Sequence, residues 1–338
     1  MASQSDSNWT RIPLLLAALA AFRLLFPTSS SLASVELEGG ATTLGPRDCA
    51  RVVPLAGNFD RDTPPFFFPS PDVCALKAYN HSEGRACLSG RKVYVLGNSI
   101  ARGFQFELLA MYGDAEAGAV SRTEQKIFCQ SAWEANGQPC TLQLSADSPV
   151  RYWDMHLFMA DDALDIRDPC RLGYASTLDC LKFVLADSAP GDILVFYLGG
   201  SYAKYRYDLK RSELNSSEAW EEWLELSAQH FKGALNEAWK GEARDVFHVR
   251  LAHIQQWFAH WNPTQAMLDN QKVFMDTIPL VNRVLDRAFE DAPWSVVDQW
   301  GINEGRDEEY TDEVHFQGLL SRVFWHVVLS SVCGSTDS

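Results

Sequence analysis

The sequence predicts an α/β fold in which a parallel sheet is covered on both faces by helices. Two observations carry this prediction. Short apolar runs typical of fully buried strands recur along the chain, and segments with helical periodicity lie between them. Such alternation is typical of parallel sheets in three-layer domains. The 338 residues, 46% of them hydrophobic, are enough to build one sizeable core.

The first half of this pattern begins with the apolar run "VYVL", predicted as a strand at 93–96. A helix is predicted from 100 to 111, because Ile100, Phe104, Leu108 and Met111 fall on one face. A less regular stretch is predicted between about 113 and 175. A helix over 178–185 then ends at "APGD", and "ILVFYL" predicts a second strand that ends at a glycine pair.

The second half repeats the alternation. A long amphipathic helix is predicted over 217–239, followed by a third strand in "VFHVRLA". Apolar residues spaced three and four apart predict a helix over 278–289, and "WSVVDQW" contains the fourth strand. The last helix is predicted over 319–328 and ends before Cys333.

The N-terminal region has a different character. Arg11 precedes an apolar run from Ile12 to Phe22, which has the length of a signal-peptide core and is short for a membrane span. Residues 1–33 are therefore predicted to be a signal peptide, with an uncleaved single-pass membrane anchor as the alternative. Residues 34–85 form a Pro/Gly-rich lead-in, and residues 86–338 form the predicted domain.

Eight cysteines downstream of a signal-like segment predict disulfides and an oxidising compartment. The local pairs Cys129–Cys140 and Cys170–Cys180 would close short loops, and Cys49 could join Cys333. The absence of any CxxC pair argues against a structural zinc site. Two sequons, at Asn80 and Asn215, could carry glycans. We thus expect the domain in the secretory pathway, either secreted or anchored with the domain in the lumen.

Charge excludes one class of partner. The chain has 29 Lys and Arg against 44 Asp and Glu, a formal net charge of −15. Such a surface repels phosphate backbones, so nucleic acid is not an expected partner.

Chemistry is predicted at Ser99, which follows the first strand in the motif Gly97-Asn98-Ser99. In open parallel sheets, ligands bind at the carboxyl ends of the strands. A serine there would lie at the start of a helix, where free backbone N–H groups point outward. The alternative is that Ser99 only caps that helix.

A serine hydroxyl needs a base before it can act as a nucleophile. The segment "YTDEVHFQG" supplies Asp312 and His315, three residues apart and just before the last helix. We predict Ser99 as the nucleophile, His315 as the base and Asp312 as the residue that orients its ring. The alternatives are a structural histidine and a capping or solvated acid.

Together, "CLSGRKVYVLGNSIARGFQFEL" and "YTDEVHFQG" resemble the PC-esterase branch of the SGNH (GDSL-type) hydrolases, which includes the trichome-birefringence-like polysaccharide O-acetyltransferases. The resemblance spans roughly residues 74–333. The residues that match the family motifs are Cys87, Gly97, Ser99, Arg102, Asp312 and His315. It implies a flavodoxin-like α/β/α fold, a serine acyl-enzyme, and acetyl transfer to or hydrolysis from glycan hydroxyls, with no metal or organic cofactor.

Two positions depart from the family pattern. Asn98 replaces the aspartate of G-D-S, and Tyr197 stands where the family has an oxyanion-binding asparagine. If Tyr197 displaces that donor, Tyr197→Asn should raise activity; by strand parity, its ring can instead point into the core. The predicted oxyanion donors are the backbone N–H groups of Ser99 and of Gly199 or Gly200.

The predicted substrate-binding residues are Arg102 and Asn98, and a surface role for Arg102 is equally open. The sequence thus predicts a serine-dependent acyl esterase or O-acyltransferase, with acetyl as the expected group. Its expected partner is a carbohydrate or another acylated small molecule. The alternative is a catalytically inactive glycan-binding or structural ectodomain with the same fold.

Overall fold

The computed structural model describes residues 77–114, 139–155, 176–198, 217–252, 265–303 and 318–333, with the short stretches 57–59, 67–69, 129, 309–310 and 315–316. Of residues 57–59, 67–69, 154, 217 and 265–275 only the backbone is described. All described residues belong to one compact unit, Thr42–Ser338.

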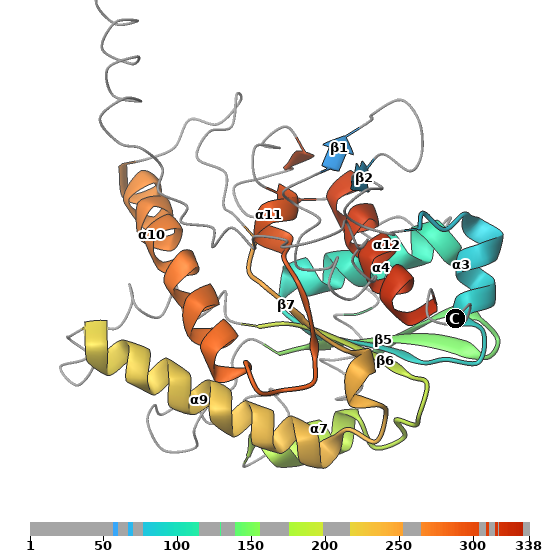
Figure 1. Cartoon of the computed structure of the whole chain (residues 1–338), viewed down its shortest axis with the longest axis horizontal. Helices are drawn as coiled ribbons and strands as arrows, with labels where there is room; N and C mark the ends of the chain where they lie inside the picture. Colours follow the sequence, from blue (N-terminus) through green and yellow to red (C-terminus); the bar gives the residue numbers. More distant parts are fainter. Residues whose placement is uncertain are drawn as a thin grey trace, which may run out of the picture. The chain divides into compact units, whose positions relative to one another are not determined.

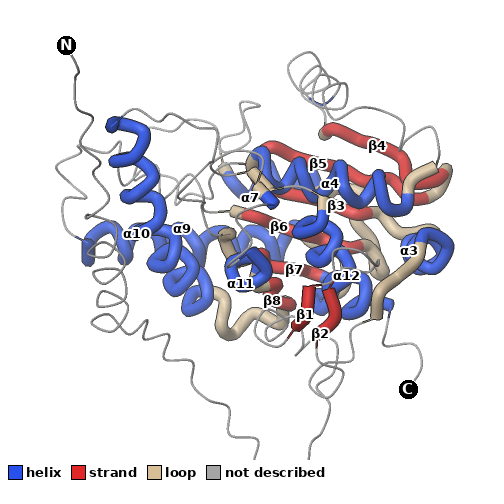
Figure 2. The backbone as a smooth tube through the Cα atoms, turned by 90° about the horizontal axis from the view of Figure 1, so that it is seen from above, coloured by secondary structure: helices blue, strands red, loops and turns tan. Residues whose placement is uncertain are grey.

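The core of the molecule is a six-stranded sheet in the order β4-β5-β3-β6-β7-β8 (Figure 2). Only β4 is antiparallel to its neighbour. Counted along the chain, the five parallel strands lie in the order 2-1-3-4-5, which is the flavodoxin-like order. The predicted fold class is therefore confirmed. The strands are β3 (Val93–Gly97), β4 (Cys140–Ser145), β5 (Ser148–Asp154), β6 (Ile193–Tyr197), β7 (Val246–Val249) and β8 (Ser295–Val297).

Helices lie on both sides of this sheet (Figure 1), with α4 and α12 on one side and α7 and α9 on the other. The helices are α3 (His81–Leu88), α4 (Ser99–Tyr112), α7 (Thr177–Val184), α9 (Ser217–Ala238), α10 (Gln265–Ala288), α11 (Gln299–Asn303) and α12 (Leu319–Cys333), with a 3-10 turn at Ala243–Asp245. A separate antiparallel pair joins β1 (Gly57–Phe59) to β2 (Phe67–Pro69).

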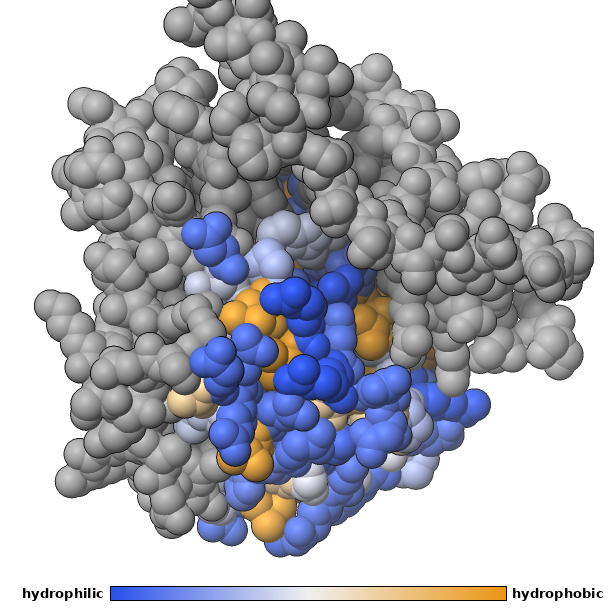
Figure 3. All heavy atoms as spheres, turned by 60° about the vertical axis from the view of Figure 1, so that its left-hand side comes forward, coloured by the Kyte–Doolittle hydropathy of each residue, from blue (hydrophilic) through white to orange (hydrophobic). Residues whose placement is uncertain are grey.

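Neighbouring residues of β6 show how the two layers divide the core. Phe196 packs against Phe231 of α9 and against Phe289, which follows α10. The next residue, Tyr197, packs against Phe104 of α4. Successive side chains of a strand point to opposite faces, so a fully apolar strand is needed to serve both layers. The side toward α9 and α10 carries mainly hydrophilic side chains at its surface (Figure 3).

The stretch predicted to be less regular, about 113–175, contains the two strands β4 and β5, which the sequence pattern does not identify. The segment "SPVRYWD" of β5 contains Pro149 and Arg151, which interrupt the apolar pattern typical of a buried strand. The strand nevertheless lies next to the centre of the sheet. Two element boundaries also differ. Helix α10 begins at Gln265 rather than at 278, and α12 includes Cys333.

Two disulfides join described residues. Cys129 is bonded to Cys140, as predicted, whereas Cys333 is bonded to Cys87 and not to Cys49. The Cys87 bridge joins the end of α3 to the end of α12, two elements that pack together. Cys180 is also disulfide-bonded, and no described cysteine is free. Its predicted pairing with Cys170 lies outside the described residues.

The predicted leader, residues 1–33, lies outside the described residues. None of the helices in the described part of the chain combines the length and the apolar character needed to cross a membrane. Of the two sequons, only Asn80 is described; it is exposed and caps the N-terminus of α3.

Two histidines titrate far from the usual range. Burial and the nearby Arg322 lower the pKa of His326 to about 4, while His326 Nδ1 accepts a hydrogen bond from Tyr79 N–H at 3.3 Å. Burial and Arg250 likewise lower the pKa of His248 to about 3. Between pH 6.5 and pH 4, these two histidines therefore bind protons in the unfolded chain but stay unprotonated in the folded protein.

This difference predicts a loss of stability in acid. For His326 alone, the free energy of unfolding should fall by about 3 kcal/mol as the pH drops from 6.5 to 4. His326→Asn keeps an acceptor near the Nδ1 position but does not titrate, so its unfolding free energy should fall less steeply. Urea unfolding at several pH values measures both slopes, and equal slopes for the two proteins would contradict the assignment.

Gly97 ends β3 with a φ of +146°, and a Cβ there would lie 2.3 Å from the carbonyl oxygen of Tyr197. We expect Gly97→Ala to lower the free energy of unfolding by about 3 kcal/mol or more, through strain and overpacking. Gly103→Ala is the matched control, because no atom lies within 4 Å of its Cβ position in the described structure. In α4 that change should stabilise by about 0.5–1 kcal/mol. Urea unfolding of the two variants distinguishes the two effects.

Candidate active site

Ser99 is the first residue of α4 and follows β3 directly. The strand order reverses between β3 and β6, since the chain runs from β3 outward to β5 on one side and to β6 on the other. Such a reversal is where flavodoxin-like sheets bind their ligands. The half-buried Ser99 thus lies at the expected ligand-binding edge of the sheet.

Asn98 is the N-cap of α4, and its side-chain oxygen accepts a hydrogen bond from Ile100 N–H at 2.9 Å. Asparagine and aspartate are equally good in this role. Asn98 therefore holds the turn that presents Ser99 as well as an aspartate would.

Tyr152 of β5 fixes the peptide groups of this turn. Its hydroxyl lies 3.1 Å from the carbonyl oxygens of both Gly97 and Asn98. The Asn98 carbonyl also accepts from Arg102 N–H at 3.1 Å, as the first bond of the helix. In a planar trans peptide the N–H points away from the preceding C=O, so Ser99 N–H points away from the helix. That is the orientation required of the predicted oxyanion donor.

His315 lies beside Ser99 although 216 residues separate them in the sequence; its Nε2 is 2.7 Å from Ser99 Oγ. The prediction that these two side chains meet is confirmed. With the ring proton on Nδ1, the serine hydroxyl donates to Nε2, which is the direction a general base needs. Asp312, Gly199 and Gly200 lie outside the described residues, so their predicted roles stay predictions.

The loop that carries His315 is held on both sides. Tyr310 and Phe316 form a β-bridge, and both side chains are buried. Gly318, with a φ of +57°, then turns the chain into α12. This left-handed conformation favours glycine, and the turn joins the loop that carries His315 to the start of α12.

A buried polar chain supports the same loop. Gln299 Nε2 donates to Asn303 Oδ1 at 2.6 Å, and Asn303 Nδ2 donates to the Tyr310 hydroxyl at 2.8 Å. Gln299 and Asn303 are fully buried in α11. The sequence gives no signal for these positioning residues, because their roles depend on contacts made only in the fold.

Helices α4 and α12 pack against each other close to the site. Phe104 stacks on Phe324 at 4.2 Å, and Trp325 Nε1 donates to the Phe104 carbonyl at 2.7 Å. Arg322 forms an ion pair with Glu107 at 2.7 Å, and Glu107 is almost fully buried. These contacts fix the helix after His315 against the helix that begins at Ser99.

Tyr197 does not occupy the position of an oxyanion donor. It is 3% exposed, its ring packs edge-on to Phe104, and its hydroxyl accepts from Ala252 N–H at 2.9 Å. Burial raises its pKa above the usual value near 10. The alternative based on strand parity, in which the Tyr197 ring points into the core, is therefore confirmed. Tyr197→Asn would remove core packing, so the structure gives no support to the expectation of higher activity.

Arg102 lies one turn beyond Ser99 and is half-buried. Within the described part of the chain, no hydrogen bond or ion pair engages its guanidinium. No three His, Cys, Asp or Glu side chains among the described residues are grouped so as to hold a metal ion.

Comparison with known proteins gives only a distant likeness. No family model matches the chain, and no curated protein matches it. Among solved structures, it is similar to LAE5, an α/β hydrolase from the metagenome of Lake Arreo, Spain (11% identity, TM-score 0.37, covering 74% of this chain and 98% of that one). It is also similar to Axe2, an acetylxylan esterase from Geobacillus stearothermophilus (11%, 0.37, 72% and 95%), and to a lipase/acylhydrolase from Enterococcus faecalis (14%, 0.35, 72% and 96%). Because these identities and TM-scores are low, the fold assignment rests on the strand order of the sheet and not on these similarities.

The support of the histidine loop is testable at Tyr310. Tyr310→Phe removes the hydroxyl that accepts from Asn303, and we expect kcat for an aryl ester to fall about tenfold with KM nearly unchanged. The control is Tyr112→Phe, which removes the hydroxyl of another buried tyrosine, bonded to Tyr79 C=O at 3.3 Å and located at the opposite end of α4 from Ser99. Its activity should be that of the unmodified protein. Equal losses in both variants would show a general effect on stability and not one on the loop.

Proposed function

We propose that this chain is a serine-dependent acyl esterase or O-acyltransferase of the SGNH type, with acetyl as the expected group and a glycan as the expected substrate. The observation that carries the proposal is the 2.7 Å contact between Ser99 Oγ and His315 Nε2 at the switch point of the sheet. A hydroxyl that only capped α4 would not need this partner, and Asn98 already fills the cap.

The chemistry follows from these positions. Ser99 Oγ attacks the acyl carbonyl while its proton moves to His315 Nε2, and the negative charge that develops on the carbonyl oxygen faces Ser99 N–H at the positive end of α4. His315 then gives the proton to the leaving sugar oxygen, and the acyl group remains on Ser99. Water or a second sugar hydroxyl, deprotonated by His315, releases it. Asp312 would hold the other ring nitrogen.

Substrate binding and compartment belong to the same proposal. Arg102, whose guanidinium has no partner among the described residues, is placed to bind a polar or acidic group of the substrate, and Asn98 lies beside it in sequence. The disulfides Cys87–Cys333 and Cys129–Cys140 support an oxidising compartment, in the secretory pathway or outside the cell.

The test is acylation of Ser99. Incubation with an aryl acetate, acid quenching and peptide mass spectrometry should place one acetyl group on the peptide that contains Ser99. Ser99→Ala and His315→Ala should each lower kcat by about 10⁴- to 10⁶-fold, and the double variant should be little worse. Ser89→Ala and His81→Ala are the controls, because both side chains are exposed and neither contacts the pair.

Product analysis separates the two reactions. Free acetate identifies an esterase, whereas acetyl transfer onto an added oligosaccharide identifies a transferase. Failure of every ester to acylate Ser99 would sink the proposal and leave the inactive glycan-binding ectodomain as the better reading.

A further inference from the structure

Asn80 and the two residues after it form a sequon at the start of α3. The middle residue is His81 and not proline, as N-glycosylation requires. Asn80, His81 and Ser82 are all exposed, so the surface around the sequon has room for a bulky group. The reaction proposed for Ser99 makes no use of this segment.

The oxygen of the Asn80 side-chain amide is occupied by the helix. Oδ1 accepts hydrogen bonds from Glu83 N–H at 3.0 Å and from the Ser82 hydroxyl at 2.8 Å. The Glu83 carboxylate accepts in turn from Asn80 N–H at 3.0 Å, which completes a capping box. A backbone N–H can only donate, so the cap requires the amide oxygen, and not the nitrogen, to face the helix.

The nitrogen of the same amide is left for another use. Asn80 Nδ2 makes no hydrogen bond within the part of the chain that the structure describes, and its residue is exposed. An N-linked glycan is attached to this nitrogen. Because capping uses Oδ1 and a glycan uses Nδ2, one side chain can do both.

Neighbouring contacts fix the sequon at one place on the surface. Tyr79 N–H donates to His326 Nδ1 of α12 at 3.3 Å. His81 Nε2 lies 3.2 Å from the carbonyl oxygen of Gly113, the C-cap residue of α4. Asn80 therefore lies near the C-terminal end of α4, beside which α3 packs (Figure 1).

Ser99 is at the other end of the same helix. Helix α4 has 14 residues, so its two ends lie about 20 Å apart. Asp114, which follows α4, donates from its N–H to Leu144 C=O at 3.2 Å, close to where β5 begins. This is the edge at which the parallel strands start, opposite to the edge that carries Ser99. A group attached to Asn80 would therefore leave the pair of Ser99 and His315 open to a substrate.

We propose that Asn80 carries an N-linked glycan and caps α3 with the same side chain. In the attachment step a bond forms between Nδ2 and C1 of the first sugar, and the bond from C1 to the diphosphate of a lipid-linked oligosaccharide breaks. Nδ2 loses one proton, and the lipid diphosphate leaves with the electron pair of the broken bond. The step requires passage through the secretory pathway, which the disulfide Cys87–Cys333 at the end of α3 supports. It goes beyond the reaction proposed for Ser99 and does not depend on it.

The experiment expresses the full chain, with its own N-terminal region, in eukaryotic cells that secrete glycoproteins. Asn215→Gln removes the other sequon outside residues 1–33. Treatment with a peptide N-glycosidase in ¹⁸O-water converts a glycosylated asparagine to ¹⁸O-labelled aspartate. We expect this label at position 80 in the tryptic peptide Ala78–Arg85, read by mass spectrometry. Omission of the glycosidase controls for spontaneous deamidation.

Two variants at one position test the sequon without removing the cap. Ser82→Ala removes the hydroxyl that the sequon requires and keeps Asn80, so the label should be lost. Ser82→Thr is the matched control, because it keeps a sequon and should keep the label.

Two variants of Asn80 test the cap without a glycan. Asn80→Asp and Asn80→Ala both remove the acceptor nitrogen, but aspartate still caps the helix and alanine does not. We therefore expect a lower urea midpoint for Asn80→Ala than for Asn80→Asp.

The proposal is overturned if position 80 is recovered unlabelled from the Asn215→Gln chain, or if Ser82→Ala keeps the label. Equal urea midpoints for Asn80→Asp and Asn80→Ala would overturn the shared role of the side chain. The label is read without any turnover, so a chain that proves inactive as an esterase leaves this result unchanged.

Discussion

The packing of α12 against α4 is the contact on which the candidate site depends. Ser99 starts α4 and His315 lies just before α12, so the distance between hydroxyl and imidazole is set by how the two helices meet. The Phe104–Phe324 stack, the Trp325 bond to the Phe104 carbonyl and the ion pair Arg322–Glu107 all lie in this interface. The bridge Cys87–Cys333 ties the far end of α12 to α3, which itself packs on α4. A shift of either helix would separate the pair.

The sequence predicted much of this arrangement because the relevant signals are local. Buried parallel strands are apolar on both faces, so 193–198 is recognisable as one without knowledge of its neighbours. Strand, Gly97-Asn98-Ser99 and helix form one continuous segment, and their order in the chain implies the edge of the sheet. The contact between Ser99 and His315 could be predicted because the motif that contains Asp312 and His315 comes directly before the last helix, at the same edge of the sheet as Ser99.

The missed features are those fixed by partners distant in sequence. The strand β5 lies beside β3, yet Arg151 and Pro149 give it a polar sequence, and only its pairing identifies it. Tyr152 in that strand acts on the Ser99 turn through its hydroxyl, a role without any pattern in sequence. The same holds for Cys333, whose spacing to Cys49 and to Cys87 fits a bridge equally well. Asp312, Gly199 and Gly200 stay predictions because they lie outside the described residues.

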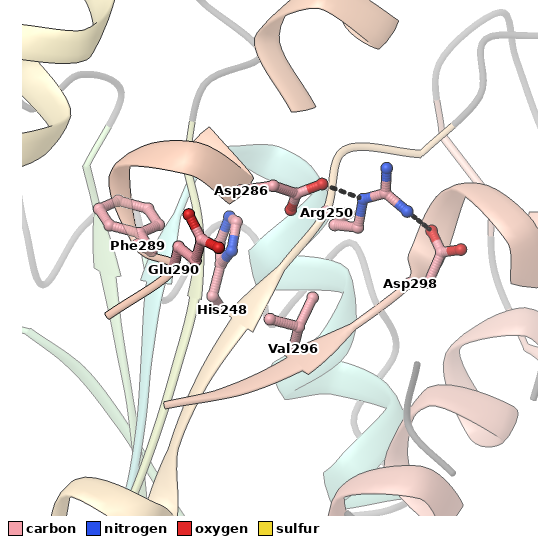
Figure 4. A pocket seen from close by; sticks show the side chains of 7 residues that line it. All are labelled: His248, Arg250, Asp286, Phe289, Glu290, Val296 and Asp298. Carbon is pink, nitrogen blue, oxygen red and sulfur yellow. Dashed lines mark ion pairs between the residues drawn. The ribbon is translucent and has the colours of Figure 1, made fainter. Parts of the chain in front are cut away.

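Successive residues of each strand point to opposite faces of the sheet, so the two faces carry different sets of side chains. Gly97 and Tyr197 pair in register on the α4 face, and Gly97 must lack a side chain because the Tyr197 carbonyl lies where its Cβ would be. One position earlier, Leu96, Phe196, His248 and Val296 form a row across four strands that faces the other layer. Three members of that row are apolar, as a buried row should be. His248 interrupts it, and a buried polar side chain without a hydrogen-bond partner among the described residues lowers stability. The same sheet therefore presents Ser99 at its edge on one face and buries an uncharged imidazole between aromatic rings on the other (Figure 4).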